Sequence, residues 1–68
     1  MKHISTYFKE GAELKSRAEV VVENGDYSIH YYNLNGQLFH TESFAGKSLQ
    51  YVEDAAENWA LGIKVLNG

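Results

Sequence analysis

The sequence predicts an α+β fold: a meander of three to four antiparallel strands packed against one C-terminal helix. Two Asn-Gly pairs, at residues 24–25 and 35–36, are strong short signals of a tight turn between antiparallel strands. The residues around these pairs alternate between apolar and polar, which is typical of half-buried strands. Beyond residue 46 the apolar residues are spaced by three and four, which is typical of an amphipathic helix.

A chain of 68 residues is long enough for a single small domain, which we place at residues 1–68. A core of this size supplies only about 3–5 kcal/mol of net stability. The sequence contains no cysteine, which excludes disulfides and thiolate metal sites, and it contains no proline. We therefore expect the fold to depend on tight packing or on self-association.

The N-terminal stretch HISTYFKEG has the pattern of a first strand. Ile4, Thr6 and Phe8 alternate there with Ser5 and Tyr7, as residues on opposite faces of a strand do. The residues from 12 to 22 then form either one long strand or a loop that leads into one. Whether residues 1–10 are ordered decides between three and four strands.

The first Asn-Gly pair defines the register of a hairpin. If Asn24 and Gly25 are the two loop residues, Glu23 pairs with Asp26 and the pairing continues outwards from there. The patterns of the two strands then agree, because apolar residues gather on one face of both. That face carries Ala18, Val20, Val22, Tyr27, Ile29 and Tyr31, and the opposite face carries Glu19, Val21, Ser28 and His30.

The second Asn-Gly pair leaves two registers open for the next hairpin. A two-residue loop at 35–36 pairs Tyr32 with Phe39. The same loop pairs Tyr31 with His40. A three-residue loop with a glycine bulge instead pairs Tyr31 with Phe39. In both registers the stretch GQLFHTESF forms a further strand of the meander.

The C-terminal stretch predicts a helix that begins after Ser48, a residue type favoured at helix N-caps. Its apolar stripe runs from Leu49 to Ile63, and Gly62 lies inside the last turns, where it weakens the helix. Trp59 is the natural centre of the core. The predicted core consists of Val20, Val22, Tyr27, Ile29, Tyr31, Leu49, Val52, Ala56, Trp59 and Ile63.

The formal net charge of −3 argues against nucleic acid and anionic membranes as partners, because both bind through an excess of Lys and Arg. The N-terminus lacks the apolar run of a signal peptide. Apolar runs such as Val20 to Val22 are far too short to span a membrane. We therefore expect a cytoplasmic protein that does not associate with membranes.

No residue pattern indicates catalysis. Glu53 and Glu57 share a helix face, but this face lies away from the apolar stripe, so we expect both carboxylates to be solvated. His3, His30 and His40 lack the local spacing of metal ligands. The sequence has no Gly-rich phosphate loop. We therefore expect a protein that is not an enzyme and needs no cofactor and no metal.

A single helix covers only one face of a four-stranded sheet, so the opposite face is left open. In the two-residue-loop register His30, Tyr32 and Phe39 share this open face with Val21. An exposed apolar patch commonly marks a protein interface. We therefore expect a protein-interaction module whose interface consists of these four residues, with a second copy of itself as a homodimer, or another protein, as the partner.

An alternative function is nucleic-acid binding. Sheets that bind single-stranded RNA present aromatic side chains for base stacking beside basic residues. Tyr32 and Phe39 would supply the stacking surface, and Lys9, Lys15 and Arg17 would supply the basic patch. A steep salt dependence of binding would favour this alternative.

Two stretches resemble known families. The helical stretch resembles in outline the last helix of double-stranded RNA-binding domains, through Ala55-Ala56 and Ala60-Leu61, but it lacks the lysines that hold phosphate there. The stretch YYNLNGQLFHTESF, followed by SLQYVEDAAENWALGIKVL, resembles small proteins of marine cyanophages and their cyanobacterial hosts. That family has no assigned activity, so the resemblance implies only a small cytoplasmic phage-type protein, with a host protein as a candidate partner.

Overall fold

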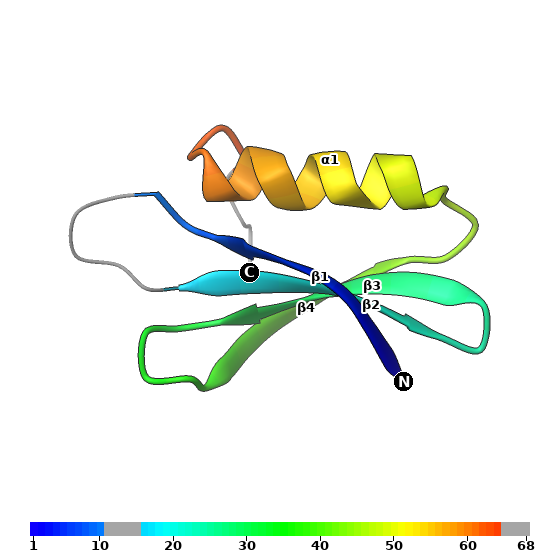
Figure 1. The fold of residues 1–68 in the computed structure, drawn as a ribbon, viewed down its shortest axis with the longest axis horizontal. Coiled ribbons are helices and arrows are strands. Elements are labelled where there is room, and N and C mark those ends of the chain that lie inside the picture. The colour runs from blue at the N-terminus through cyan, green and yellow to red at the C-terminus, as the bar shows by residue number, and fades with distance from the viewer. Residues whose placement is uncertain (11–15, 65–68) are drawn as a thin grey trace.

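Strands and helix follow one another along the chain in the predicted order (Figure 1). The computed structural model of the protein describes residues 1–10 and 16–64. Within these residues one helix packs on a single antiparallel sheet in which the strands are neighbours in chain order, so the α+β meander is confirmed. The first residues do form a strand, which makes the sheet four-stranded. The elements are β1 (Lys2–Phe8), β2 (Arg17–Glu23), β3 (Asp26–Tyr32), β4 (Leu38–Phe44) and α1 (Leu49–Ala60).

The β2–β3 hairpin has the predicted register. Asn24 and Gly25 adopt positive φ angles of 54° and 84°, as both central residues of a type I′ turn require. Glu23 pairs with Asp26, and the pairing continues to Arg17 and Tyr32 at the other end of the strands. The apolar residues of both strands therefore lie on the same face, under the helix.

The β3–β4 connection is a five-residue loop, residues 33–37, which neither predicted register contains. The Asn33 side chain accepts hydrogen bonds from the backbone N–H groups of Asn35 and Gln37, which closes the loop around it. Tyr31 pairs with His40, as in the two-residue register, but Tyr32 pairs with Leu38.

Each of the two edge strands contains a β-bulge. Ile4 in β1 and Phe39 in β4 are the extra residues between regularly paired neighbours. A bulge places two successive side chains on the same side of the strand. Ile4 consequently packs against the core, and the Phe39 ring lies 6.4 Å from the ring of Tyr31.

The helix is capped at both ends. The Ser48 side chain accepts a hydrogen bond from the N–H of Tyr51, which confirms the predicted N-cap. At the other end Gly62, with φ of 82°, turns the chain, and Ile63 donates its N–H to the carbonyl of Asn58. This pattern is a Schellman motif, so Gly62 ends the helix and does not lie inside it.

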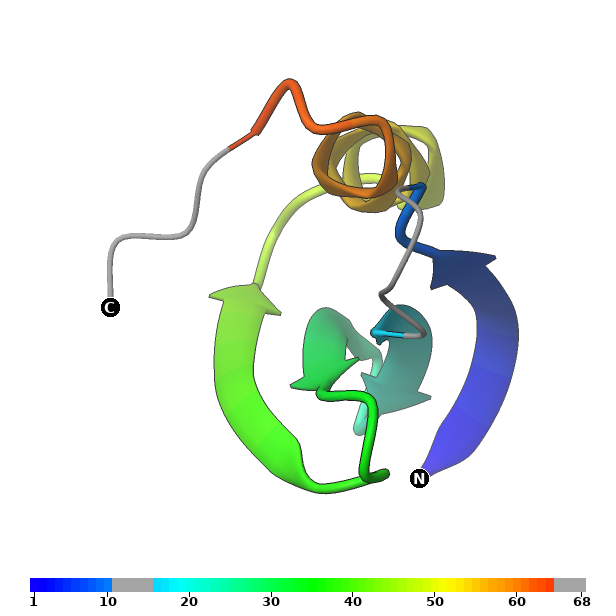
Figure 2. The same ribbon diagram turned by 90° about the vertical axis from the view of Figure 1, so that its left-hand side faces the viewer.

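The core lies between α1 and the central strands β2 and β3 (Figure 2). The Trp59 ring packs edge-on against Tyr31, with 5.0 Å between the ring centroids. Ile63 is 69% exposed, so its predicted place in the core is wrong: the helix ends before it. Val22, Tyr27 and Leu49 are half-buried at the margin. The buried cluster is Ala18, Val20, Ile29, Tyr31, Val52, Ala56, Trp59 and Ala60.

Candidate interaction surface

The sheet face opposite α1 is the open face, and its side chains form three rows that each cross all four strands. The register of the three strand pairs defines the rows. The end row lies beside the β3–β4 loop, the middle row follows, and the far row lies near the N-terminus. The end row is Phe8, Arg17, Tyr32 and Leu38, the middle row is Thr6, Glu19, His30 and Thr41, and the far row is His3, Val21, Ser28 and Ser43.

The end row is the apolar part of the open face. Phe8 and Leu38, at its two ends, are 64% and 52% exposed. Between them the Arg17 guanidinium lies over the ring of Tyr32, 4.3 Å from its centroid, and leaves Tyr32 half-buried. A planar cation stacked on an aromatic ring gains a cation–π attraction and stays available for hydrogen bonding at its edges. The end row thus combines apolar area with an oriented cation.

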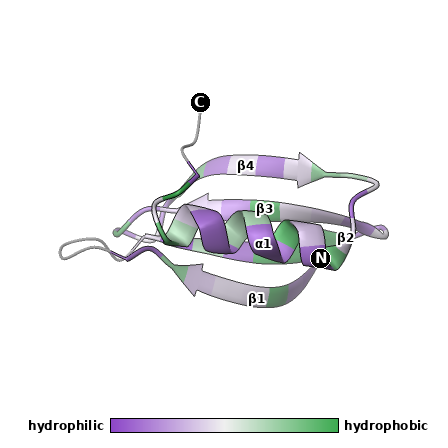
Figure 3. Cartoon of the chain, turned by 90° about the horizontal axis from the view of Figure 1, so that it is seen from above, coloured by the Kyte–Doolittle hydropathy of each residue, from purple (hydrophilic) through white to green (hydrophobic). Residues whose placement is uncertain are grey.

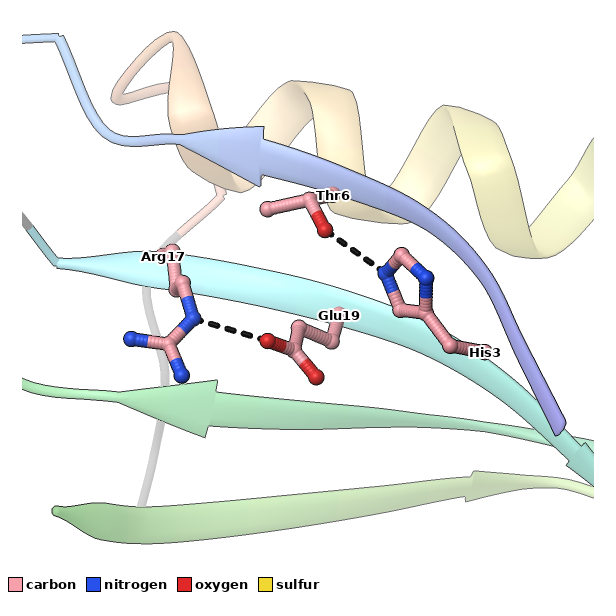
Figure 4. Close-up of polar contacts among 4 residues, drawn as sticks. All are labelled: His3, Thr6, Arg17 and Glu19. Carbon is pink, nitrogen blue, oxygen red and sulfur yellow. Dashed lines mark hydrogen bonds and ion pairs between the residues drawn. The ribbon is translucent and has the colours of Figure 1, made fainter. Parts of the chain in front are cut away.

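Polar contacts hold several side chains of the open face in place (Figure 4). Arg17 donates through Nε to the Glu19 carboxylate at 2.8 Å, and His3 and Thr6 share a hydrogen bond of 2.7 Å. Both partners of the Arg17–Glu19 ion pair keep about a quarter of their side-chain area exposed, so the pair adds little to stability. Its effect is to orient the guanidinium along the face.

Two of the four predicted interface residues, Val21 and Phe39, are not exposed on the open face as expected. Val21 is on the open face but only 3% exposed, because this small side chain lies on a central strand between His3 and Ser28. Phe39 is 52% exposed but its ring lies beside Tyr31, whose side chain is buried under the helix. Val21, Tyr32 and Phe39 therefore do not form the expected apolar patch on the open face. Phe39 lies beside Tyr31 because it is the extra residue of the β4 bulge.

The other two predicted interface residues lie on the open face as expected. Tyr32 belongs to the end row, and His30 lies in the middle row between Glu19 and Thr41. The sequence reasoning missed Phe8 and Leu38 as interface candidates. The signal for Phe8 was its alternation in the first strand, whereas Leu38 depends on a bulge that no local pattern indicated.

Two of the basic residues expected to bind nucleic acid, Lys9 and Arg17, are not brought together. Lys9 donates from Nζ to the backbone carbonyl of Trp59 at 3.0 Å, and its Nζ lies 4.8 Å from the Trp59 ring centroid. A cation at this place compensates the negative end of the helix dipole. Arg17 lies on the open face, on the other side of the sheet. Lys15 lies outside the described residues.

On the helix side, Glu53 joins α1 to β1. Its carboxylate accepts hydrogen bonds from the hydroxyls of Ser5, at 2.7 Å, and of Tyr7. The expectation that Glu53 is solvated is therefore wrong, whereas Glu57 is exposed as predicted. Burial, and then the bond to Glu53, raise the pKa of Tyr7 to about 12 from 10.0.

A second tyrosine–carboxylate pair lies at the other side of the sheet. The Tyr31 hydroxyl donates to Glu42 at 2.9 Å, and Lys64 forms an ion pair of 3.2 Å with the same carboxylate. Burial, and then the bond to Glu42, raise the pKa of Tyr31 well above its ordinary range. The Tyr7–Glu53 pair connects β1 to the helix, whereas the Tyr31–Glu42 pair connects the neighbouring strands β3 and β4.

The three histidines lie apart from one another. His3 and His30 are on different rows of the open face, and His40 is on the helix side, with its ring 5.5 Å from that of Tyr31. In the described part of the chain, His, Cys, Asp and Glu side chains nowhere gather in a group of three or more that could hold a metal ion.

Comparison with known proteins gives no match: no family model, no curated protein and no solved structure is significantly similar to this chain. Residues 1–10 and 16–64 contain no helix that is long and apolar enough to cross a membrane.

Proposed function

We propose that the protein is a non-enzymatic protein-interaction module that associates with a second copy of itself through the open face. The observation that carries the proposal is the end row, in which two exposed apolar side chains flank Arg17 stacked on Tyr32. Tyr and Arg are enriched among the residues that dominate binding energy in protein interfaces, together with buried aromatic anchors. The flanking middle row is polar, as the rim of an interface usually is.

The size of the open face bears on affinity. Seven-residue strands and four-strand width give the face a flat outline of about 23 by 19 Å. A face of these dimensions is at the small end for an interface, since each partner of a standard interface contributes roughly 800 Å² of accessible surface. We therefore expect association in the micromolar range or weaker, which concentrated samples reveal and dilute samples do not.

Nucleic-acid binding is the weaker of the two functions expected from the sequence. The Arg17–Tyr32 stack and the exposed Phe8 ring favour it, since single-stranded nucleic acids bind to aromatic and guanidinium planes. The formal net charge of −3 opposes it, and Lys9 is already bound to the end of the helix. The two functions differ in their salt dependence.

The test is the solution mass of the purified protein by sedimentation equilibrium, from micromolar to millimolar concentration, in low and high salt. We expect a concentration-dependent rise in mass that high salt leaves unchanged, because apolar contacts are not screened. The variant Leu38→Ser, which removes an exposed apolar side chain of the end row, should weaken association about tenfold.

Tyr51→Ser is the matched control, because Tyr51 is also 52% exposed but lies on α1, away from the open face. Equal weakening by both substitutions would contradict the open face as the interface. A mass that stays monomeric to millimolar concentration would contradict self-association. Binding of RNA oligonucleotides that weakens steeply with salt would then favour the alternative function, and capture of a host protein would favour the phage-type setting expected from the resemblance.

A further inference from the structure

Among the described residues β4 is an edge strand of the sheet, with β3 as its hydrogen-bonded neighbour. The helix lies mainly over β1, β2 and β3, and it meets β4 at one end, where the rings of Tyr51 and Phe44 have centroids 6.0 Å apart (Figure 3). Among the described residues no strand follows β4 on that side of the sheet. Native edge strands are commonly protected by charged side chains, especially Lys, or by Pro. β4 contains Glu42 but no Lys, Arg or Pro, whereas β1 begins with Lys2. Its bulge at Phe39 interrupts only the first part of the edge.

The hydrogen-bonding direction of each residue in β4 follows from the register. The two residues that flank a two-residue turn exchange hydrogen bonds, and along the ladder every second pair does the same. Counting from Glu23 and Asp26, the odd-numbered residues of β3 bond toward β4, and their partners there are even-numbered. The backbone N–H and C=O groups of Thr41 and Ser43 therefore point outwards from the free edge.

The side chains of β4 are complementary to a second β4 in one antiparallel register. With a two-fold axis at Thr41, the two Thr41 residues face each other, and each His40 faces Glu42 of the other copy. An imidazole opposite a carboxylate and a Thr–Thr pair are both favourable cross-strand pairs. With the axis at Glu42 two carboxylates oppose each other, and with the axis at Ser43 Glu42 meets Phe44.

We propose that β4 pairs antiparallel with β4 of a second copy about a two-fold axis at Thr41, which joins the two sheets into one continuous sheet. This edge pairing does not depend on the open face, whose apolar end row lies on a different surface. A chain that uses both surfaces has two separate self-complementary contacts and assembles beyond a dimer.

The first test is amide hydrogen exchange in the unmodified protein at low and high concentration. The N–H groups of Thr41 and Ser43 face solvent in the single chain, so they should exchange fast when dilute. We expect their exchange to slow about tenfold when nine-tenths of the chain is paired. Equal exchange of both amides at the two concentrations, while the mass shows association, would overturn the edge pairing.

The second test is a matched pair of substitutions at Thr41. Proline is tolerated on an edge strand where the N–H faces solvent, so Thr41→Pro removes the outward donor without removing a bond to β3. Thr41→Val keeps the donor and the β-branched shape. We expect Thr41→Pro to abolish the slowed exchange of Ser43 and Thr41→Val to keep it.

The outcomes separate the two surfaces. Retained association and retained Ser43 protection in folded Thr41→Pro would overturn the edge pairing and leave the open face untouched. Weaker association of Leu38→Ser, with the Ser43 amide still slowed at concentrations where the variant remains paired, would establish the edge independently of the open face. If Thr41→Pro does not fold, the exchange of the unmodified protein still decides the question.

Discussion

Single side chains connect the layers of this small protein. Trp59 packs the helix onto Tyr31, and the Glu53 carboxylate accepts hydrogen bonds from the hydroxyls of Ser5 and Tyr7 of β1. Each contact joins elements that are far apart in the chain. Because the core contains few residues, each such contact carries a large share of the net stability.

The first prediction concerns Trp59, which is 4% exposed. Trp59→Ala should lower the free energy of unfolding by about 3–5 kcal/mol, which is comparable to the net stability expected of a core this small. We therefore expect the variant to be largely unfolded at room temperature by circular dichroism. Tyr51→Ala, an exposed aromatic on the same helix, should stay folded; a melting temperature of Trp59→Ala within a few degrees of the unmodified protein would contradict the prediction.

The second prediction concerns alkaline pH. Folding raises the pKa of Tyr7 from 10.0 to about 12, so between these values the unfolded chain has lost the proton that the folded chain still holds. The contribution of this group to stability is complete below pH 10 and is lost as pH rises through about 12. The variant Tyr7→Phe has no ionisable hydroxyl at this position. Its midpoint of urea unfolding should therefore fall less than that of the unmodified protein as pH rises.

Burial and the bond to Glu42 also raise the pKa of Tyr31, so Tyr31 too makes stability fall as pH rises. Tyr7→Phe therefore removes only part of the loss of stability at alkaline pH. Tyr51→Phe, on the exposed side of α1, is the control. An identical pH dependence in Tyr7→Phe and in the unmodified protein would show that Tyr7 does not titrate as described.

At the scale of elements, the turns decide how well the fold follows from the sequence. The Asn24–Gly25 pair predicts its hairpin correctly, because a two-residue turn leaves one register. The Asn-Gly pair at 35–36 does not predict its hairpin register. Asn33 closes a longer loop there, and Phe39 is the extra residue of a bulge. This bulge places the Phe39 ring beside Tyr31. Such packing is a tertiary effect, which local sequence patterns do not contain.

The third prediction concerns the end of the helix. Gly62 has φ of 82°, and a Cβ built on it would meet nothing within 4 Å. The cost of Gly62→Ala is therefore conformational only, about 1–2 kcal/mol. Gly62→Asn should cost less, because Asn adopts this region more readily. Chemical denaturation measures both; equal stability of Gly62→Ala and the unmodified protein would contradict the role of Gly62 as the helix terminator.

At the scale of the whole molecule, one helix on a four-stranded sheet leaves a face and an edge available for a partner. That the face is open was predictable from the count of elements, and so was the presence of Tyr32 and His30 on it. Leu38 of its apolar end row was not, because its pairing with Tyr32 depends on the β4 bulge, whereas alternation in the first strand was a signal for Phe8. The composition of the open face thus depends on the β3–β4 register, which the sequence left open.

The central claim is that the protein self-associates through the open face, and a dilution series followed by amide NMR tests it most directly. We predict that the amide resonances of the end row, above all those of Arg17 and Tyr32, shift with concentration. The amide resonances of the solvent-facing residues of α1 should stay constant. Resonances that do not move between micromolar and millimolar concentration, or that move only along the helix, would contradict the claim.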